Sequence, residues 1–207
     1  GAVSAIDDTT PTAGEESWDD VTGADSVPGG PTGNNMFHYS NSSLMDGVTV
    51  VASYTPSNGT TELESSSDYA VKYTGIDGLT VGYAGGDNET TATNVRESSN
   101  LWATYTMDAF TFGIQDNEAD GQTANGDTEY RAYGISYAVT DDLSVSYGMS
   151  QFEYENTTLE DQDASGMSVS YTNGSVTLSA SMNEVDNVAG TATTDNSGYE
   201  INFTFAF

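Results

Sequence analysis

The sequence predicts an all-β protein whose strands form one antiparallel, up-and-down sheet, and three observations support this. Apolar and polar residues alternate over most of the chain after residue 34, which is the period-two pattern of strands with two different faces. Short turns rich in Asp, Asn and Gly alternate with longer polar loops, as in a series of hairpins. The alternating segments are also long for a soluble sheet, where five or six residues is usual.

Composition excludes several classes of protein. The chain has 207 residues and no cysteine, so a disulfide framework or a thiolate metal site is impossible. It carries 32 Asp and Glu against 3 Lys and Arg, a formal charge of -29, which argues against nucleic-acid binding and predicts a field that attracts cations. Its 13 Tyr and 7 Phe recur evenly and argue against disorder. The acids avoid the alternating stretches, so we expect them in loops.

Residues 1–33 differ from the rest of the chain because they show no periodicity. They hold several prolines and glycines and many acids, and this composition predicts a long loop. The first residues, Gly1 to Ser4, lack the basic region of a signal peptide. We therefore expect that a signal was removed or that the chain starts inside a longer protein.

The alternation after residue 34 divides into eleven expected strands. These are residues 34–42, 48–56, 67–76, 79–88, 98–107, 110–119, 128–140, 143–156, 164–172, 175–187 and 197–207. The short connections are expected at 45–47, Asp77-Gly78, Asp108-Ala109, Asp141-Asp142 and Asn173-Gly174. The long ones are expected at 57–66, 89–97, 120–127, 157–163 and 188–196. The meander thus has one end with tight turns and one with elaborate loops.

The second face of the strands distinguishes a membrane barrel from a soluble sandwich. One face is aliphatic in its middle and rich in Tyr and Phe towards the strand ends, whereas the other carries Ser, Thr, Gly, Asn and Gln. A bilayer-spanning barrel needs an apolar outer band, aromatic girdles and a polar lumen, and it must close to satisfy its backbone groups. We therefore favour a transmembrane β-barrel over residues 34–207.

The last strand, Gly198 to Phe207, carries a resemblance to a known family. Its alternating aromatics ending in a C-terminal Phe resemble the terminal strand of Gram-negative outer-membrane general porins. In that family such a strand is the signal recognised by the outer-membrane assembly machinery, which implies this role for Tyr199, Phe203, Phe205 and Phe207.

The resemblance also implies an architecture. General porins are trimers of barrels with about sixteen strands. Counted back from Phe207, the expected strands become strands six to sixteen, and residues 1–33 become the acidic loop that folds into the lumen and narrows it. Bacterial single-chain barrels have even strand numbers, so an odd count implies that strands one to five are missing. The implied location is the outer membrane, in contact with lipid and lipopolysaccharide.

Charged residues provide the candidate pore sites. Carboxylate arcs select cations, so the acids of the first loop are candidates for a constriction, unless that loop is external and solvated. They are Asp7, Asp8, Glu15, Glu16, Asp19, Asp20 and Asp25. Trp18, Val21 and Val27 could anchor the loop on the wall.

Two basic residues are further candidates. Lys72 lies between the outward residues Val71 and Tyr73, so the alternation places its side chain on the lumen side. Arg131 alternates in step with outward tyrosines and could hold lipopolysaccharide phosphate at the rim. The alternative for each is an ordinary ion pair.

Metal binding and catalysis have weaker support. Asp116, Glu118, Asp120 and Asp127 have the spacing of a calcium loop, although they lie between strands and chance matches are common in so acidic a chain. Calcium bridging between acidic loops is a broader alternative, and no other cofactor is expected. His38 is the only histidine, so no histidine-based catalytic group can be assembled and no enzyme is expected.

The function expected from these observations is that of an outer-membrane porin. It would be a water-filled channel for passive diffusion of small hydrophilic solutes and ions, with a preference for cations. The alternative is a soluble or surface-exposed acidic β-sandwich or adhesin from a saline-adapted bacterium, in which the apolar faces would meet one another. An enzyme in a smaller outer-membrane barrel is a further alternative, which would need a catalytic cluster at the rim.

Overall fold

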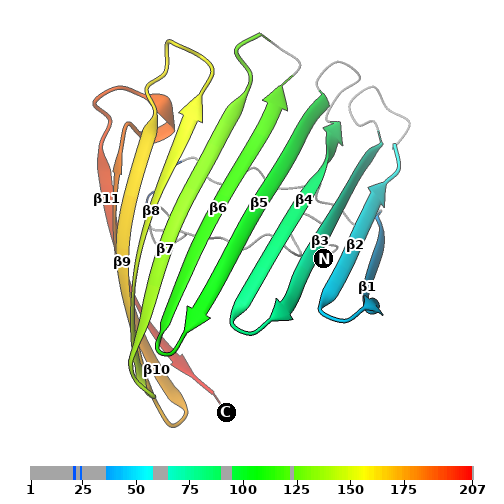
Figure 1. The fold of residues 1–207 in the computed structure, drawn as a ribbon. Coiled ribbons are helices and arrows are strands. Elements are labelled where there is room, and N and C mark those ends of the chain that lie inside the picture. Colours follow the sequence, from blue (N-terminus) through cyan, green and yellow to red (C-terminus); the bar gives the residue numbers. More distant parts are fainter. Residues whose placement is uncertain are drawn as a thin grey trace.

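The computed structural model describes Val21, Ala24 and residues 36–57, 65–89, 95–121 and 124–206. In this part of the chain, eleven antiparallel strands form one sheet, and their order in the sheet is their order in the sequence (Figure 1). The strands are β1 (Phe37–Met45), β2 (Val48–Thr55), β3 (Ser66–Ile76), β4 (Leu79–Glu89), β5 (Val95–Met107), β6 (Phe110–Gly121), β7 (Thr128–Thr140), β8 (Leu143–Tyr154), β9 (Gln162–Asn173), β10 (Val176–Asp186) and β11 (Asn196–Phe205). The predicted up-and-down topology is confirmed.

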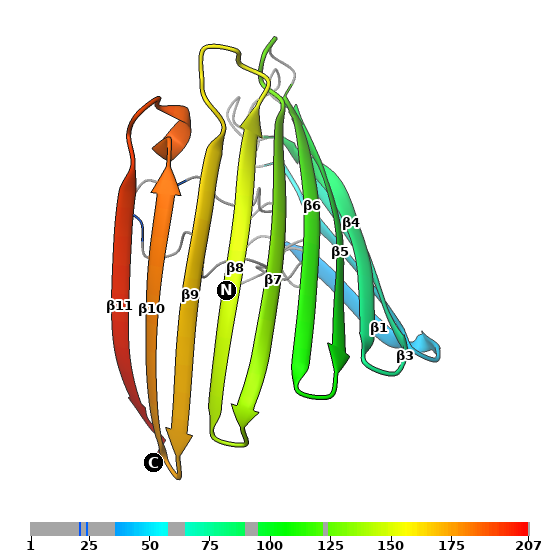
Figure 2. The same ribbon diagram turned by 60° about the vertical axis from the view of Figure 1, so that its left-hand side comes forward.

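The sheet curves strongly around one side, as two views of the ribbon show (Figures 1 and 2). All short turns lie at one end of the strands and all long connections at the other. Strands β1 and β11 form the two edges, and they do not pair with each other within the described residues. A short 3-10 turn, η2 (Val188–Gly190), follows β10. No helix among the described residues is long and apolar enough to cross a membrane.

The tight turns follow from local backbone chemistry. Gly78 has a φ of +72°, and a Cβ at this position would lie 2.3 Å from the carbonyl oxygen of Thr106. The backbone N–H of Thr106 donates to the carbonyl of Gly78 at 2.8 Å and ties this turn to β5. The turn between β9 and β10 is Gly174–Ser175, one residue later than predicted.

The strands extend further than the apolar alternation indicates. Strand β5 begins at Val95 and β6 ends at Gly121, so both continue into segments that the sequence assigned to loops. Strand β9 begins at Gln162, two residues before the predicted start. Backbone hydrogen bonds pair strands regardless of side-chain polarity, whereas apolar alternation marks only the part of a strand that has one apolar face.

The two faces of the sheet carry opposite chemistry, and the large apolar side chains lie on the outside of the curve. Ile114 of β6, Met167 of β9 and Met182 of β10, which all have a neighbouring strand on both sides, are 54%, 54% and 59% exposed. Buried side chains belong to the inward face and are mostly small or polar, including Ala70 and Asn117. A soluble sandwich would bury its apolar faces against each other, so this distribution argues against the sandwich alternative.

A cross-strand pair on the inward face shows how the wall is packed. Gly82 of β4 is directly opposite Trp102 of β5, and the indole is buried. A Cβ at position 82 would lie 1.1 Å from the Cζ3 atom of this ring. The glycine therefore provides the space in which the indole lies flat against the neighbouring strand.

We predict that Gly82→Val destabilises the fold by about 1–3 kcal/mol, because the added side chain forces Trp102 out of its position. Denaturant unfolding in detergent micelles, followed by tryptophan fluorescence, measures this loss. Gly134→Val is the matched control, since Gly134 is a glycine of β7 whose Cβ would meet nothing within 4 Å. Equal stability of the two variants would show that the indole does not need this space.

Candidate functional site

The inward face presents hydrogen-bonding groups along the whole sheet. Neighbouring strands place hydroxyls opposite one another, with oxygen–oxygen distances of 2.7 Å for Ser146 and Ser168 and 3.0 Å for Thr172 and Thr177. Buried amide side chains are added by Asn100, Gln115, Asn117, Gln162 and Asn183. The inward wall is thus rich in hydrogen-bonding groups, as the wall of a polar lumen must be.

Charged groups on the inward face lie mainly on β3. Lys72 lies on this face, as the alternation predicted, with Thr49 and Gly82 opposite it on the two neighbouring strands. Asp68 lies four residues before Lys72 on the same face, and the hydroxyl of Ser53 donates to its buried carboxylate. The sequence analysis missed Asp68, although its parity with Lys72 places it on the lumen side.

One point of the N-terminal segment contacts the inward wall. Val21 is 5% exposed and packs in one apolar cluster with Ala164 of β9, Val185 of β10 and Val188 of η2. Ala24 packs against the same cluster. The seven candidate constriction acids lie outside the described residues, as do Trp18 and Val27. The expected anchoring role of Val21 is thus supported by contacts, whereas the positions of the acids stay a prediction.

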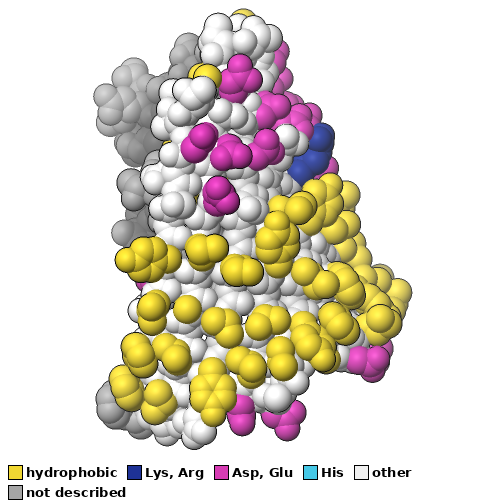
Figure 3. Space-filling model, turned by 90° about the vertical axis from the view of Figure 1, so that its left-hand side faces the viewer, with side chains coloured by type: hydrophobic (Ala, Val, Ile, Leu, Met, Phe, Trp, Pro, Cys, Tyr) yellow, Lys and Arg dark blue, Asp and Glu magenta, His cyan; other side chains and the backbone are white. Residues whose placement is uncertain are grey.

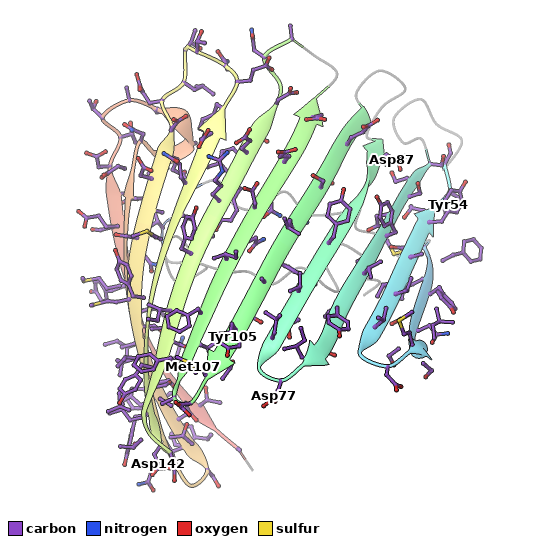
Figure 4. The ribbon with its side chains drawn as sticks, viewed as in Figure 1. Tyr54, Asp77, Asp87, Tyr105, Met107 and Asp142 are labelled. Carbon is purple, nitrogen blue, oxygen red and sulfur yellow. The ribbon has the colours of Figure 1, made fainter. Side chains whose placement is uncertain are left out.

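The outward face carries a continuous apolar belt at the turn end of the strands. Its members are Val71, Tyr73, Tyr83, Leu101, Tyr105, Phe110, Phe112, Ile114, Tyr133, Ile135, Tyr137, Val145, Tyr147, Met149, Met167, Val169, Tyr171, Leu178, Met182, Tyr199, Ile201, Phe203 and Phe205. Figure 3 shows hydrophobic side chains as a band across the lower half of the face that it draws. Tyr105 and Met107 lie near the turn end in Figure 4. An exposed apolar surface of this extent needs an apolar solvent such as lipid.

The outward face changes abruptly above this belt. Within the next two outward positions, each of the strands β4 to β10 carries an acid. We call the outward acids of this level the carboxylate collar: Asp87, Glu97, Asp116, Glu118, Asp120, Glu129, Glu153, Asp163, Glu184 and Asp186. Figure 3 shows acidic side chains above the band, and Figure 4 shows Asp87 near the loop end of its strand. The expectation that the acids belong to loops is therefore wrong for these residues, because the strands continue beyond the belt.

Strand register places many collar acids directly opposite one another. Glu97 pairs with Asp87 on one side and Asp120 on the other. Asp163 likewise pairs with Asp186. Like charges at directly opposed positions destabilise a sheet, so this surface depends on cations for compensation.

Among the described side chains, Arg131 is the cation that bonds to acids of the collar. It lies on the outward face of β7, as predicted, and its guanidinium forms salt bridges with Asp116 at 3.4 Å, Glu153 at 2.8 Å and Glu129. One positive and three negative charges leave the group with a formal charge of −2. The predicted contact with lipopolysaccharide phosphate is untested, and the guanidinium is already bonded within the protein.

The predicted calcium spacing lies along an extended strand. Asp116, Glu118 and Asp120 occupy alternate outward positions of β6, and Asp116 bonds to Arg131. The Oδ1 atom of Asp127 accepts the backbone N–H of Gly121 at 2.9 Å. The described residues contain no group of three or more His, Cys, Asp or Glu side chains placed to hold a metal ion. The geometry of this segment therefore adds no support to the calcium prediction.

The C-terminal strand has the face pattern expected for it. Tyr199, Phe203 and Phe205 are exposed on the outward face of β11, in register with Met182, Leu178 and Val176 of β10. Phe207 lies outside the described residues. The proposed assembly signal is thus one outward aromatic row at the edge of the sheet, and its role stays a prediction.

We predict that Arg131→Gln lowers the unfolding temperature at low salt, because it leaves three carboxylates without their shared cation. Salt screens exposed charges over about 10 Å at 0.1 M, so added sodium chloride should reduce the loss. Thermal unfolding in detergent at several salt concentrations measures this, with Arg131→Lys as the charge-preserving control. A loss that salt leaves unchanged would mean that packing of the arginine side chain, rather than charge, is the cause.

Comparison with solved structures identifies the fold. The chain is similar to a porin refined at 1.8 Å resolution, with a TM-score of 0.72, 17% identity, and coverage of 100% of this chain and 75% of that one. It is also similar to an anion-selective porin from Comamonas acidovorans, with a TM-score of 0.69, 16% identity, and coverage of 96% and 66%. The third is OmpF from Salmonella typhi in complex with daunomycin, with a TM-score of 0.68, 16% identity, and coverage of 99% and 70%.

These coverages show that the chain spans about two thirds of the length of the Comamonas porin. Comparison with curated protein sequences gives no match. The family model described as Gram-negative porin matches residues 2–154, most of the chain. Together with a belt that faces lipid and a polar inward wall, this match leads to one conclusion: the chain belongs to the Gram-negative porin family and is an integral protein of the outer membrane.

Proposed function

We propose that the protein forms a water-filled channel through which small hydrophilic solutes and ions diffuse passively. The observation that carries this proposal is the distribution of side chains over the two faces of one continuous sheet. The inward face carries hydroxyls, amides, Asp68 and Lys72, whereas the outward face carries the apolar belt. A sheet that curves around its polar face can enclose water, and its apolar face can contact lipid.

We further propose that the N-terminal segment narrows this channel. Val21 packs on the inward residues Ala164 and Val185, so at this point the segment lies on the lumen side of the wall. Asp19, Asp20 and Asp25 are close to Val21 in sequence, which supports the assignment of the segment's carboxylates to the aqueous path.

Cation preference is the third part of the proposal. The Comamonas porin of similar fold is described as anion-selective, so selectivity must come from side chains rather than from the fold. In this chain the candidate loop is acidic, and carboxylates at a narrow point raise the local concentration of cations. A homotrimeric state and recognition by the outer-membrane assembly machinery are further proposals, which rest on the family resemblance.

Selectivity can be tested with the full-length protein in planar bilayers under a salt gradient. We expect a reversal potential that shows cation preference. Replacing the seven acids of residues 1–33 by Asn or Gln should shift that potential towards zero, because the fixed charge at the narrow point is removed.

The matched control replaces Asp87, Glu97, Glu118, Asp120, Glu129, Glu153 and Glu184, an equal number of acids from the outward collar. It should leave the reversal potential nearly unchanged, since these side chains face away from the lumen. A shift of equal size in both variants would show that general surface charge, and not the N-terminal segment, controls the permeating ions.

The anchoring of the segment predicts a separate effect on conductance. Val21→Asp places a charge among Ala164, Val185 and Val188, and burying an unpaired carboxylate is costly enough to detach the segment locally. Single-channel recordings should show larger and noisier conductance for this variant, and wild-type behaviour for Val21→Leu. Unchanged conductance in Val21→Asp would contradict a constriction held at this point.

A further inference from the structure

The connection between β10 and β11 holds several residues in the left-handed region of the backbone. Asn187, Ala189 and Thr193 have φ values of +53°, +52° and +60°, and they are three of the five described non-glycine residues with positive φ. Gly190 adds a φ of +71°. This region is disfavoured for residues that carry a Cβ, so such a group persists only where surrounding contacts hold it. We call residues 187–195 the hook loop.

The hook loop turns back onto the inward face of the sheet. Val188 is buried and packs with Ala164 and Val185, which are inward residues of β9 and β10. The backbone N–H of Ala189 donates to the Oε1 atom of Gln162, a buried inward residue of β9, at 3.1 Å. Figure 2 shows η2 curled beside the loop end of β10. This part of the hook loop therefore lies on the lumen side of the wall.

A second set of contacts joins the hook loop to the connection between β8 and β9. The backbone N–H of Glu160 donates to the carbonyl of Gly190 at 3.0 Å. The Nδ2 atom of Asn187 donates to the carbonyl of Asp161 at 3.1 Å. A Cβ at Gly190 would lie 2.9 Å from the Cβ of Leu159, so the two connections approach each other closely. These contacts hold the strained backbone of the hook loop in one shape.

The hook loop also meets the N-terminal segment. Val188 belongs to the apolar cluster that contains Val21, and Ala24 packs against the same cluster. Of the four buried members, two come from the wall, one from the N-terminal segment and one from the hook loop. Three parts of the chain that are distant in sequence thus share one small apolar core on the lumen side.

We infer that the hook loop is a clamp that positions the N-terminal segment. Val188 is the contact, and Gln162 is the wall residue that fixes the backbone next to it. A loop held in one shape by two sets of hydrogen bonds presents Val188 to Val21 without a further ordering cost. The inference rests on the proposed constriction, and it adds that the passage is set in part from the loop end of the sheet.

Cross-linking in the full-length protein tests the contact without reference to conduction. The 207 residues contain no cysteine, so a pair of introduced thiols is the only pair that they supply. Val21→Cys with Val188→Cys should react rapidly with a short bismaleimide. Val21→Cys with Ala192→Cys, an exposed position of the same loop, should react more slowly. Equal rates for the two pairs would overturn the inference.

Backbone variants at Ala189 test whether the shape of the loop holds the contact. Proline cannot adopt a φ of +52° and lacks the N–H that Gln162 accepts, so we expect Ala189→Pro to slow cross-linking of the first pair roughly tenfold. Ala189→Gly is the matched control, because glycine keeps the N–H and adopts this φ freely. Gln162→Leu removes the acceptor at similar volume and should act in the same direction as the proline.

Conductance then connects the clamp to the passage. In planar bilayers, Ala189→Pro without the cysteines should give larger and noisier openings, and Ala189→Gly should behave as the wild type. Equal cross-linking in these two variants would overturn the clamp and leave the proposed constriction in place. Slower cross-linking with unchanged conductance would instead contradict the constriction, and with it the inference. Heat-dependent electrophoretic mobility confirms that each variant is folded.

Discussion

Backbone hydrogen bonding between neighbouring strands is the interaction on which the other features of this structure depend. A lipid bilayer offers no water to unpaired N–H and C=O groups, so a chain that crosses it as strands must pair every strand along its length. Strands β2 to β10 are each paired on both sides. Because side chains alternate in direction along a strand, a slip of one residue would invert both faces. The ladder therefore fixes which residues meet lipid and which meet the lumen.

The same ladder aligns the outward residues at common levels. Ile114 of β6 has Ala103 and Tyr133 opposite it, and Asp116, two residues on, has Arg131 beside it. Strands β4 to β10 thus pass from the belt into the collar while they stay paired with their neighbours. One regular element contacts two environments, acyl chains and the charged layer above them. The accumulation of like charge in that layer makes Arg131, which forms salt bridges with three of the acids, an integral part of the outer surface.

The inward wall combines a polar surface with small residues at particular positions. Gly82 accommodates the ring of Trp102, and Ala164 leaves room for Val21 beside Val185. These contacts hold a point of the N-terminal segment on a stiff sheet. In the proposed channel, the segment's own chemistry sets the character of the passage, while the strands remain much the same. This division of roles between wall and segment agrees with the similarity of fold to other porins at only 16–17% sequence identity.

The sequence by itself determined the number of strands, the tight turns and the two faces, because alternation and turn chemistry are local properties of the chain. It also placed Lys72 inward and Arg131 outward by parity alone. It did not determine that Glu97, Asp120 and Asp163 lie on strands, since apolar alternation ends where the belt ends. Only the tertiary structure brought together Asp163 with Asp186, Arg131 with Asp116 and Glu153, and Val21 with β9 and β10. These contacts join residues far apart in sequence, and pairing register and sheet curvature, which act over the whole sheet, decide them.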